Sequence, residues 1–287
     1  MVARFVAGAD LPEALTAIEA LRARGLRWTV DVLGEAVTSV ELARAAADRY
    51  VATIEALAER GLEVNVSLKL SQMGLLVDPA ACRTNVERVF AAAAAHAGFV
   101  RIDMEEHTMV EATLALWREV RAVNPASGVV IQAALRRSAA DVDALIAEGA
   151  SVRLCKGAYK EPPEVAFVTK AEVDRSFARL MERLLVEGTD PAIATHDVRL
   201  IRRAIRIARE RGIGPERFEF EMLYGVRRDL QEWLVREGWR VRIYVPYGTE
   251  WYPYFMRRLA ERPANMLFLL RSLVGEARSG RQVAGSG

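Results

Sequence analysis

The sequence predicts an α/β fold, a (β/α)8 barrel of the TIM type. The first observation is that short β-type runs alternate with amphipathic helical patterns, and eight such runs can be identified. The second is the length of 287 residues, close to the ~250 residues typical of these barrels. A doubly wound open sheet is the main alternative, but the chain contains no GxGxxG turn and no GxxxxGKS or GxxxxGKT loop.

The expected strands are short apolar runs with β-branched residues. They cover residues 27–33, 62–70, 99–104, 128–134, 150–155, 191–195, 217–222 and 239–245. The helices expected between them have apolar residues at helical spacing and cover 39–60, 80–97, 108–122, 170–187, 197–211 and 226–237. A further helix, 11–24, precedes the first strand.

No stretch rich in proline, glycine or serine divides the chain, so we expect a single barrel domain over residues 1–287. The glycine-rich end, 277–287, is expected to be disordered. No apolar stretch is long enough to span a bilayer, and the N-terminus lacks a signal-peptide pattern, which indicates a cytoplasmic protein. Cys82 and Cys155 lie outside any CxxC pattern and indicate a reducing compartment rather than a disulfide or a metal site.

The charged residues argue against one class of partner and direct attention to two side chains. The net charge of +2 argues against nucleic acid as the main partner. Only four of the 40 basic residues are lysines, at positions 69, 156, 160 and 170. Lys69 and Lys156 each follow an apolar strand-like run directly, which makes them candidates for a functional role.

Polar and aromatic side chains stand at seven of the eight expected strand ends. They are Lys69, Asp103 with Met104, Gln132, Arg153 with Lys156, Thr195 with His196, Glu221 with Leu223, and Tyr244. Because active sites of (β/α)8 barrels are built where strands end on the C-terminal face, we expect these groups to line one site. Some of them can instead be ordinary polar residues where strands meet solvent.

The segment Arg153-Leu-Cys-Lys156-Gly157-Ala158-Tyr159 is more specific than any single strand end. A strand ends in two cations and opens into Gly-Ala, where a backbone can approach a ligand closely. This suits an anionic cofactor, with Lys156 on a phosphate and Arg153 near an electron-accepting ring. Two alternatives stay open: Lys156 can form a Schiff base, as lysines at barrel strand ends do, and the Gly-Ala step can be a structural turn.

The segment from Trp251 places four polar groups on one helical face. Tyr254, Arg257, Arg258 and Glu261 fall at i, i+3, i+4 and i+7. Two guanidiniums on a rigid element form a preformed clamp for a carboxylate or a phosphate. The alternative is a solvated stripe on which Glu261 pairs with Arg257 or Arg258.

Other patterns exclude some kinds of site. His96, His107 and His196 are too scattered for a metal centre, so none is expected, and no GxSxG elbow supports hydrolase chemistry. An arginine-rich stretch lies within 197–211, with arginines at 202, 203, 206, 209 and 211. A solvated face is the better interpretation of that helix, and contact with an anionic membrane surface is the other.

Several of these segments together resemble one family. The resemblance is to the FAD-dependent barrel enzyme proline dehydrogenase, and it covers most of the chain in the right order. It rests on Arg-Leu-x-Lys-Gly-Ala-Tyr from Arg153, the run Met222-Leu-Tyr-Gly225, Tyr244-x-Pro-x-Gly, and Tyr254-x-x-Arg257-Arg258-x-x-Glu261, with Leu68-Lys-Leu70 and Ile102-Asp-Met-Glu105 as earlier matches. The length resembles the short monofunctional bacterial form.

The resemblance implies oxidation of L-proline to Δ1-pyrroline-5-carboxylate, with a hydride passing to N5 of FAD and the electrons to a quinone. It implies substrate binding by Lys69, Leu223, Tyr244, Tyr254, Arg257, Arg258 and Glu261, the last as support for the arginines. Asp103 and Arg153 would be the catalytic residues. It implies FAD binding by Met104, Gln132, Arg153, Lys156, Gly157, Ala158, Tyr159, Thr195 and His196.

Two segments depart from the family pattern. The family often has Thr-Asp-x-Ser-Tyr where this chain has Val173-Asp-Arg-Ser-Phe177, and the connection from Tyr244 to Arg257 is shorter than in bifunctional relatives. Both differences concern loop and adenosine contacts more than the chemistry. A Schiff-base aldolase that uses Lys156 and a non-catalytic barrel that senses carboxylates remain the alternative functions.

Overall fold

The computed structural model describes residues 4–260, and the side chains only up to Met256. Two compact units are present, Met1–Thr249 and Glu250–Gly287, and each is described by itself. The predictions for the side chains of Arg257 and Arg258, for Glu261 and for the tail at 277–287 lie outside the described residues. The single domain expected over 1–287 stays a prediction.

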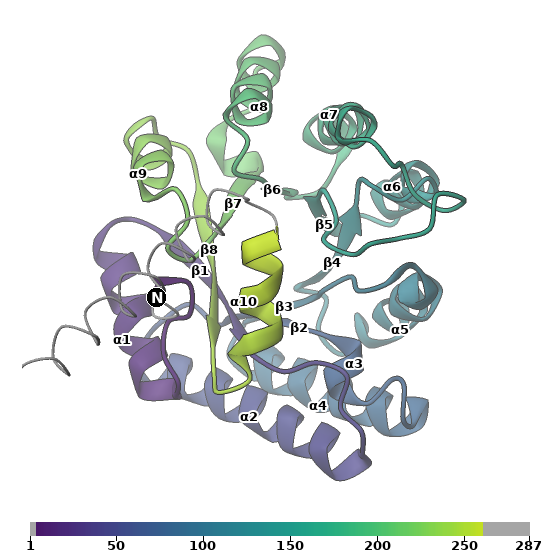
Figure 1. Ribbon diagram of the computed structural model, residues 1–287. Coiled ribbons are helices and arrows are strands. Elements are labelled where there is room, and N and C mark those ends of the chain that lie inside the picture. The colour runs from purple at the N-terminus through teal and green to yellow at the C-terminus, as the bar shows by residue number, and fades with distance from the viewer. Residues whose placement is uncertain (1–3, 261–287) are drawn as a thin grey trace, which may run out of the picture. The chain divides into compact units, whose positions relative to one another are not determined.

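The first unit is a closed barrel of eight parallel strands in the order β1 to β8, which confirms the predicted fold (Figure 1). The strands are β1 (Arg27–Val32), β2 (Asn65–Leu68), β3 (Phe99–Ile102), β4 (Ser127–Gln132), β5 (Ser151–Cys155), β6 (Ala192–Ala194), β7 (Glu219–Leu223) and β8 (Val241–Tyr247). The barrel closes where β1 pairs with β8 in parallel, with Arg27 opposite Arg242.

Helices surround this barrel. They are α1 (Leu11–Ala23), α2 (Val40–Glu59), α3 (Leu70–Met73), α4 (Pro79–Ala95), α5 (Val110–Val120), α6 (Ser138–Ala147), α7 (Lys170–Glu187), α8 (Val198–Arg211) and α9 (Arg228–Arg236). Helices α3 and α6 were not among those expected. Short 3-10 turns, His107–Met109 and Pro215–Arg217, precede α5 and β7. The second unit contributes α10 (Trp251–Ala260), whose helical backbone agrees with the expectation from residue 251 onward.

Side-chain caps explain where several helices begin. The carboxylate of Asp78 accepts from the backbone N–H groups of Ala80 and Ala81 at the start of α4. Thr169 and Glu172 form a reciprocal capping box at the start of α7. A cap of this kind stabilises a helix by about 0.5–2 kcal/mol, so these residues determine where the loop ends and the helix begins.

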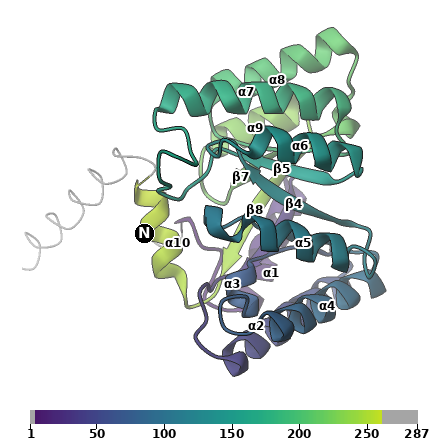
Figure 2. The same ribbon diagram turned by 90° about the vertical axis from the view of Figure 1, so that its right-hand side faces the viewer.

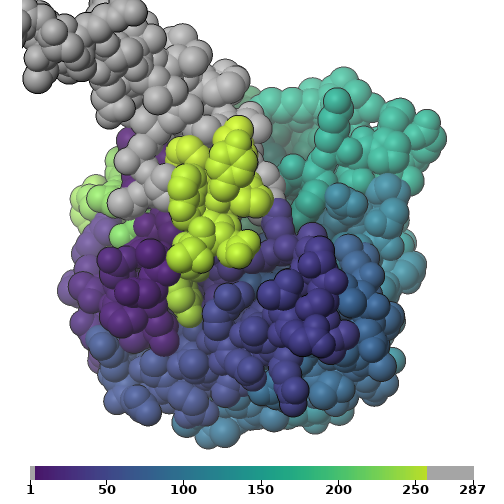
Figure 3. All heavy atoms as spheres, turned by 60° about the horizontal axis from the view of Figure 1, so that its bottom comes forward, coloured from purple at the N-terminus to yellow at the C-terminus, as the bar shows by residue number. Residues whose placement is uncertain are grey.

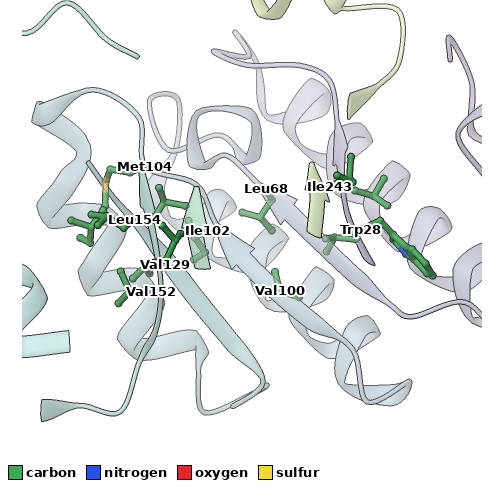
Figure 4. Close-up of a cluster of buried hydrophobic side chains, with 14 of the residues drawn as sticks. Trp28, Leu68, Val100, Ile102, Met104, Val129, Val152, Leu154 and Ile243 are labelled. Carbon is green, nitrogen blue, oxygen red and sulfur yellow. The ribbon is translucent and has the colours of Figure 1, made fainter. Parts of the chain in front are cut away.

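Alternate strand residues point outward and pack beneath the helices. Figure 4 shows Ile102, Val129, Val152 and Leu154 together on the outer side of β3, β4 and β5. All four are 0 % exposed. Burial of such aliphatic side chains contributes roughly 1.5–3 kcal/mol each, and here it joins the strands to the helices.

The inside of the barrel is polar, which the sequence interpretation did not anticipate. Arg101 of β3 reaches across β4 and donates to the backbone oxygen of Ser151 at 3.0 Å. A Cβ at Gly128 would lie 2.7 Å from Nη1 of Arg101, so only glycine leaves room for this guanidinium. Burial, with the nearby charge of Arg153, lowers the pKa of Arg101 to about 10.

A second buried arginine fills the inside of the barrel near the start of the strands. Arg242 donates through Nε to Glu219 at 2.7 Å and through Nη2 to Glu63 at 3.0 Å. Polar side chains thus take the place of the bulky branched residues that fill most barrels of this class.

The arginine-rich helix α8 lies beside α7 (Figure 2). Its apolar face is buried, and two arginines of its outer face form ion pairs with neighbouring helices, Arg203 with Glu182 at 3.3 Å and Arg209 with Glu237 at 3.6 Å. Among residues 4–260, no helix combines the length and the apolar character that crossing a bilayer requires.

Figure 3 shows a different face of the molecule. On this face the atoms of the early part of the chain, coloured purple to blue, form a continuous surface.

Candidate active site

The predicted site residues of the barrel gather at the C-terminal ends of its strands, in two neighbouring groups. Lys69 follows β2, Leu223 ends β7 and Tyr244 lies in β8, on the side where the barrel closes. The predicted cofactor residues come from the other side, between the end of β3 and the start of α8. Asp103 and Arg153 connect the two groups through the inside of the barrel.

Lys69 is held by one carboxylate and one phenol. Its Nζ donates to Oδ1 of Asp31 at 2.8 Å and to the hydroxyl of Tyr244 at 3.2 Å. The same hydroxyl donates to Oδ2 of Asp103 at 2.7 Å, and Lys69 lies 3.7 Å from that oxygen. Tyr244 therefore fixes the relative positions of a cation and a carboxylate at the mouth of the barrel.

Arg153 uses three donors in three directions. Nε donates to Oε2 of Glu221 at 2.7 Å, Nη1 to Oδ1 of Asp103 at 2.8 Å, and Nη2 to the hydroxyl of Ser67 at 2.9 Å. The guanidinium carbon lies 5.3 Å from the centre of the Tyr244 ring. Since these partners come from β7, β2, β8 and the end of β3, Arg153 crosses the barrel and cannot rotate without breaking several contacts.

Burial and charge shift the acid-base properties of this cluster in different directions. Burial alone would lower the pKa of Lys69, but Asp31 and Asp103 raise it above its ordinary value, so the amine stays cationic. Burial also raises the pKa of Tyr244 well above that of a free phenol, and Asp103 adds to the shift. Tyr244 therefore keeps its proton at neutral pH, and it donates that proton in the hydrogen bond to Asp103 and does not act as a base.

The predicted cofactor residues follow the rim from β3 to β6. Met104 and Gln132 are buried, and the side-chain amide of Gln132 donates to the backbone oxygen of Glu105 at 2.6 Å. Gly157 has φ +108°, and a Cβ there would lie 2.9 Å from Oε1 of Gln132. A glycine is required at this step, and it leaves backbone open to a ligand.

Thr195 and His196 follow β6 directly. Nε2 of His196 accepts from the backbone N–H of Leu223 at 3.0 Å, which places the proton of the neutral ring on Nδ1. The hydroxyl of Thr195 accepts from the backbone N–H of Asp197 at 3.1 Å. These contacts join the predicted cofactor side to β7, which carries a predicted substrate residue.

Lys156 lies half-buried between two carboxylates. Its Nζ is 2.5 Å from Oδ1 of Asp174 and 3.4 Å from Oδ2 of Asp197. Burial alone would raise the pKa of Asp197, but Arg199 and Lys156 lower it to about 2. The two ion pairs fix the position of the Lys156 side chain after β5.

Comparisons with known proteins identify one family for the chain. The model of the family described as proline dehydrogenase matches residues 14–271. The chain belongs to the proline dehydrogenase family. It is 39% identical over 270 residues to proline dehydrogenase 2 of Bacillus subtilis strain 168, a match that covers 94% of this chain and 89% of that protein. It is 41% identical over 276 residues to the proline dehydrogenase of Deinococcus radiodurans, with the same coverage.

A solved structure also resembles this chain. The crystal structure of proline utilization A from Bdellovibrio bacteriovorus inactivated by N-propargylglycine superimposes with a TM-score of 0.83 at 28% identity. The match covers 90% of this chain but 32% of that much longer one. The family and its relatives establish an oxidoreductase that acts on proline in proline catabolism.

The structure adds residues that the sequence interpretation missed. Asp31 is the carboxylate partner of Lys69, and the hydroxyl of Tyr50 lies 3.3 Å from its Oδ1 and 2.7 Å from the backbone oxygen of Ser67. Glu221 was noted as a strand end but not as the partner of Arg153. A signal was present, because Asp31 and Ser67 each belong to a strand in which polar and apolar residues alternate.

Other predicted residues take less specific places. Ala158 is exposed and Tyr159 half-buried on the loop after β5. Tyr254 lies on α10 in the second unit, and the backbone of that helix places residues 257 and 258 one turn further along. Among the described residues, no group of three histidine, cysteine or acidic side chains is placed to hold a metal ion.

Proposed function

We propose that this protein oxidises L-proline to Δ1-pyrroline-5-carboxylate with FAD as its resident cofactor, and that the electrons leave to a quinone. The observation that carries the proposal is the position of Arg153. It hydrogen-bonds Asp103, which belongs to the cluster around Lys69, and it stands on the strand that leads into Lys156 and Gly157. One guanidinium thus joins a site suited to a small ring carboxylate to a site suited to an anionic cofactor.

The donor set after β3 to β6 fits FAD. Gly157 gives backbone access, and Lys156 offers a cation to a phosphate. We propose that these residues hold it together with Met104, Gln132, Arg153, Ala158, Tyr159, Thr195 and His196. When bound, FAD supplies the hydride acceptor, and the protein supplies position and charge.

At the other side, Lys69 would bind the proline carboxylate, and Leu223 and Tyr244 would contact the ring. Because Asp31 and Asp103 already offset the charge of Lys69, a carboxylate needs further cations. We propose Arg257 and Arg258 for that role, with Glu261 supporting them and Tyr254 packing on the ring. Asp103, which accepts a hydrogen bond from the hydroxyl of Tyr244, would lie beside the substrate.

We expect the purified protein to be yellow, and anaerobic L-proline to bleach its oxidised flavin band. The cations of Arg153 and Lys156 and the glycine at 157 are the physical reason to expect a bound flavin. The absorption spectrum before and after adding L-proline is the measurement. A preparation reconstituted with FAD that stays oxidised under excess L-proline would overturn the assignment.

Turnover should depend on a quinone acceptor and not on soluble NAD, as family membership suggests. Steady-state rates with a short-chain quinone analogue and with NAD, at the same L-proline concentration, compare the two. If NAD supported turnover and quinone analogues did not, this part of the proposal would be abandoned.

The rate of flavin reduction should rise with pH, by roughly tenfold per pH unit, until the substrate amine is deprotonated. A protonated amine has no lone pair to assist hydride loss, and the cations proposed for the site, Arg257 and Arg258 together with Lys69, favour the neutral amine. The pKa of Lys69 is raised, so the cation persists at alkaline pH and should cause no falling limb there. Stopped-flow reduction across the pH range tests this, and a pH-independent rate would contradict it.

We propose a cytoplasmic location, with contact at an anionic membrane surface as an additional property. The arginines of α8 at 202, 206 and 211 are exposed, which leaves a basic surface available for such contact. The ion pairs of Arg203 and Arg209 reduce that charge, so any contact should be weak and sensitive to salt.

A further inference from the structure

Glu221 is a buried carboxylate to which the proposed function assigns no role. Its side chain is 3% exposed, on the inner side of β7, and its Oε2 accepts from Nε of Arg153 at 2.7 Å. Burial raises its pKa, while the charges of Arg153 and Arg101 oppose that rise. It therefore faces the same guanidinium that also holds Asp103.

The strand between the two partners makes their contact possible. In the barrel register Arg153 stands opposite Ala192, and Ala194 stands opposite Glu221. Ala192 and Ala194 have small side chains, so the space beside them inside the barrel is left to the two long side chains. Larger residues there would separate Arg153 from Glu221.

Glu221 acts on the proposed substrate site through Arg153 and not by direct contact with the substrate. The guanidinium of Arg153 forms ion pairs with both Glu221 and Asp103. Asp103 also accepts a hydrogen bond from the hydroxyl of Tyr244 and lies 3.7 Å from Lys69. If Glu221 were neutral, Arg153 would pair with Asp103 alone and the site would gain one positive charge. That gain would be felt strongly, because the intervening groups are buried.

We propose that Glu221 is a positioning residue that holds Arg153 against Asp103 and places a negative charge behind it. By that charge it sets how strongly the site binds a ring carboxylate and how readily the flavin takes up electrons. The inference rests on the proposed function, since it assumes a carboxylate substrate and a flavin at this site.

The test compares two glutamates of the same strand. Glu221→Gln removes the charge and keeps the shape. Glu219→Gln is the matched control, because Glu219 is also buried inside the barrel and ion-paired at 2.7 Å, but to Arg242. The probe is cyclopentanecarboxylate, which has the ring and the carboxylate of proline but no amine. Its dissociation constant is measured by isothermal titration on holoenzyme, and the flavin midpoint potential is measured in parallel.

In Glu221→Gln we expect cyclopentanecarboxylate to bind about tenfold more tightly and the midpoint potential to become more positive. In Glu219→Gln both should stay close to those of the unmodified enzyme. Equal shifts in the two variants, or no shift in Glu221→Gln, would overturn the inference.

A second variant tests the positioning separately and does not depend on the first one folding. Glu221→Asp keeps the charge but withdraws the carboxylate by one methylene, so affinity for the probe should be retained. Looser support of Arg153 should lower kcat for L-proline by roughly tenfold with little change in KM. An unchanged kcat would overturn the positioning role. If the unmodified enzyme neither binds the probe nor is reduced by L-proline, the proposed function itself fails.

Discussion

Replacing Arg153 with methionine is expected to lower the free energy of unfolding by about 3–5 kcal/mol. Methionine retains much of the side-chain volume but removes three hydrogen bonds, to Glu221, Asp103 and Ser67. Glu221, which is buried inside the barrel, would then lose its direct ion-pair partner. Urea unfolding of the protein without cofactor gives the stability, independent of any role of Arg153 in FAD binding.

The matched control is Arg118→Met. Arg118 also pairs closely with a glutamate, Glu148, at 2.9 Å, but its side chain is 41% exposed. Exposed ion pairs contribute about 0–1 kcal/mol, so this variant should be close to the unmodified protein. In the double variant Arg153→Met with Glu221→Met, part of the lost stability should return, because the uncompensated charge is gone. A loss in Arg153→Met no larger than in the control would contradict this account of the barrel interior.

Replacing Arg257 or Arg258 with methionine is expected to weaken binding of L-proline, or of its transition state, by about 2–4 kcal/mol. The change preserves bulk and removes a charge-assisted contact to the substrate carboxylate. The need for such contacts follows from the barrel, where Asp31 and Asp103 already offset the charge of Lys69. Steady-state kinetics with L-proline give the change in kcat/KM.

Pyrrolidine, the same ring without the carboxylate, separates substrate binding from support of the fold. It should be a poor substrate of the unmodified enzyme, and it should lose little more in the variants. The FAD content should stay nearly unchanged, because the two arginines are proposed to face the substrate. Equal proportional losses for L-proline and pyrrolidine would mean that the arginines support the fold or the flavin.

The gathering of these polar residues on one face of the barrel was predictable because of a general property of the fold. All strands of a parallel barrel end on one face, so polar residues at strand ends must gather there wherever they occur in the chain. Lys69, Asp103 and Tyr244 are distant in sequence, yet they form one connected cluster. Their exact partners were not predictable, because Arg153 reaches β7 and β2 through the barrel interior.

Helix α6 shows a second limit of prediction from the sequence. It has only ten residues, and half of them are alanine or serine, so its apolar periodicity is weak. Its position follows from packing against β4 and β5 and from the connection that a parallel strand pair requires. The connection between two parallel strands, more than apolar periodicity, is therefore what indicates a helix in this segment.

The sequence by itself determined the alternation within the strands. In Arg27-Trp-Thr-Val-Asp-Val32, small polar or charged residues alternate with apolar ones, and the segment that ends at Asp103 repeats the pattern. In an antiparallel sheet such a polar face commonly meets water. Only closure of the barrel turned it inward, and because burial of an unpaired charge is costly, charged groups there pair across the strands, as Arg153 does with Glu221 and Asp103.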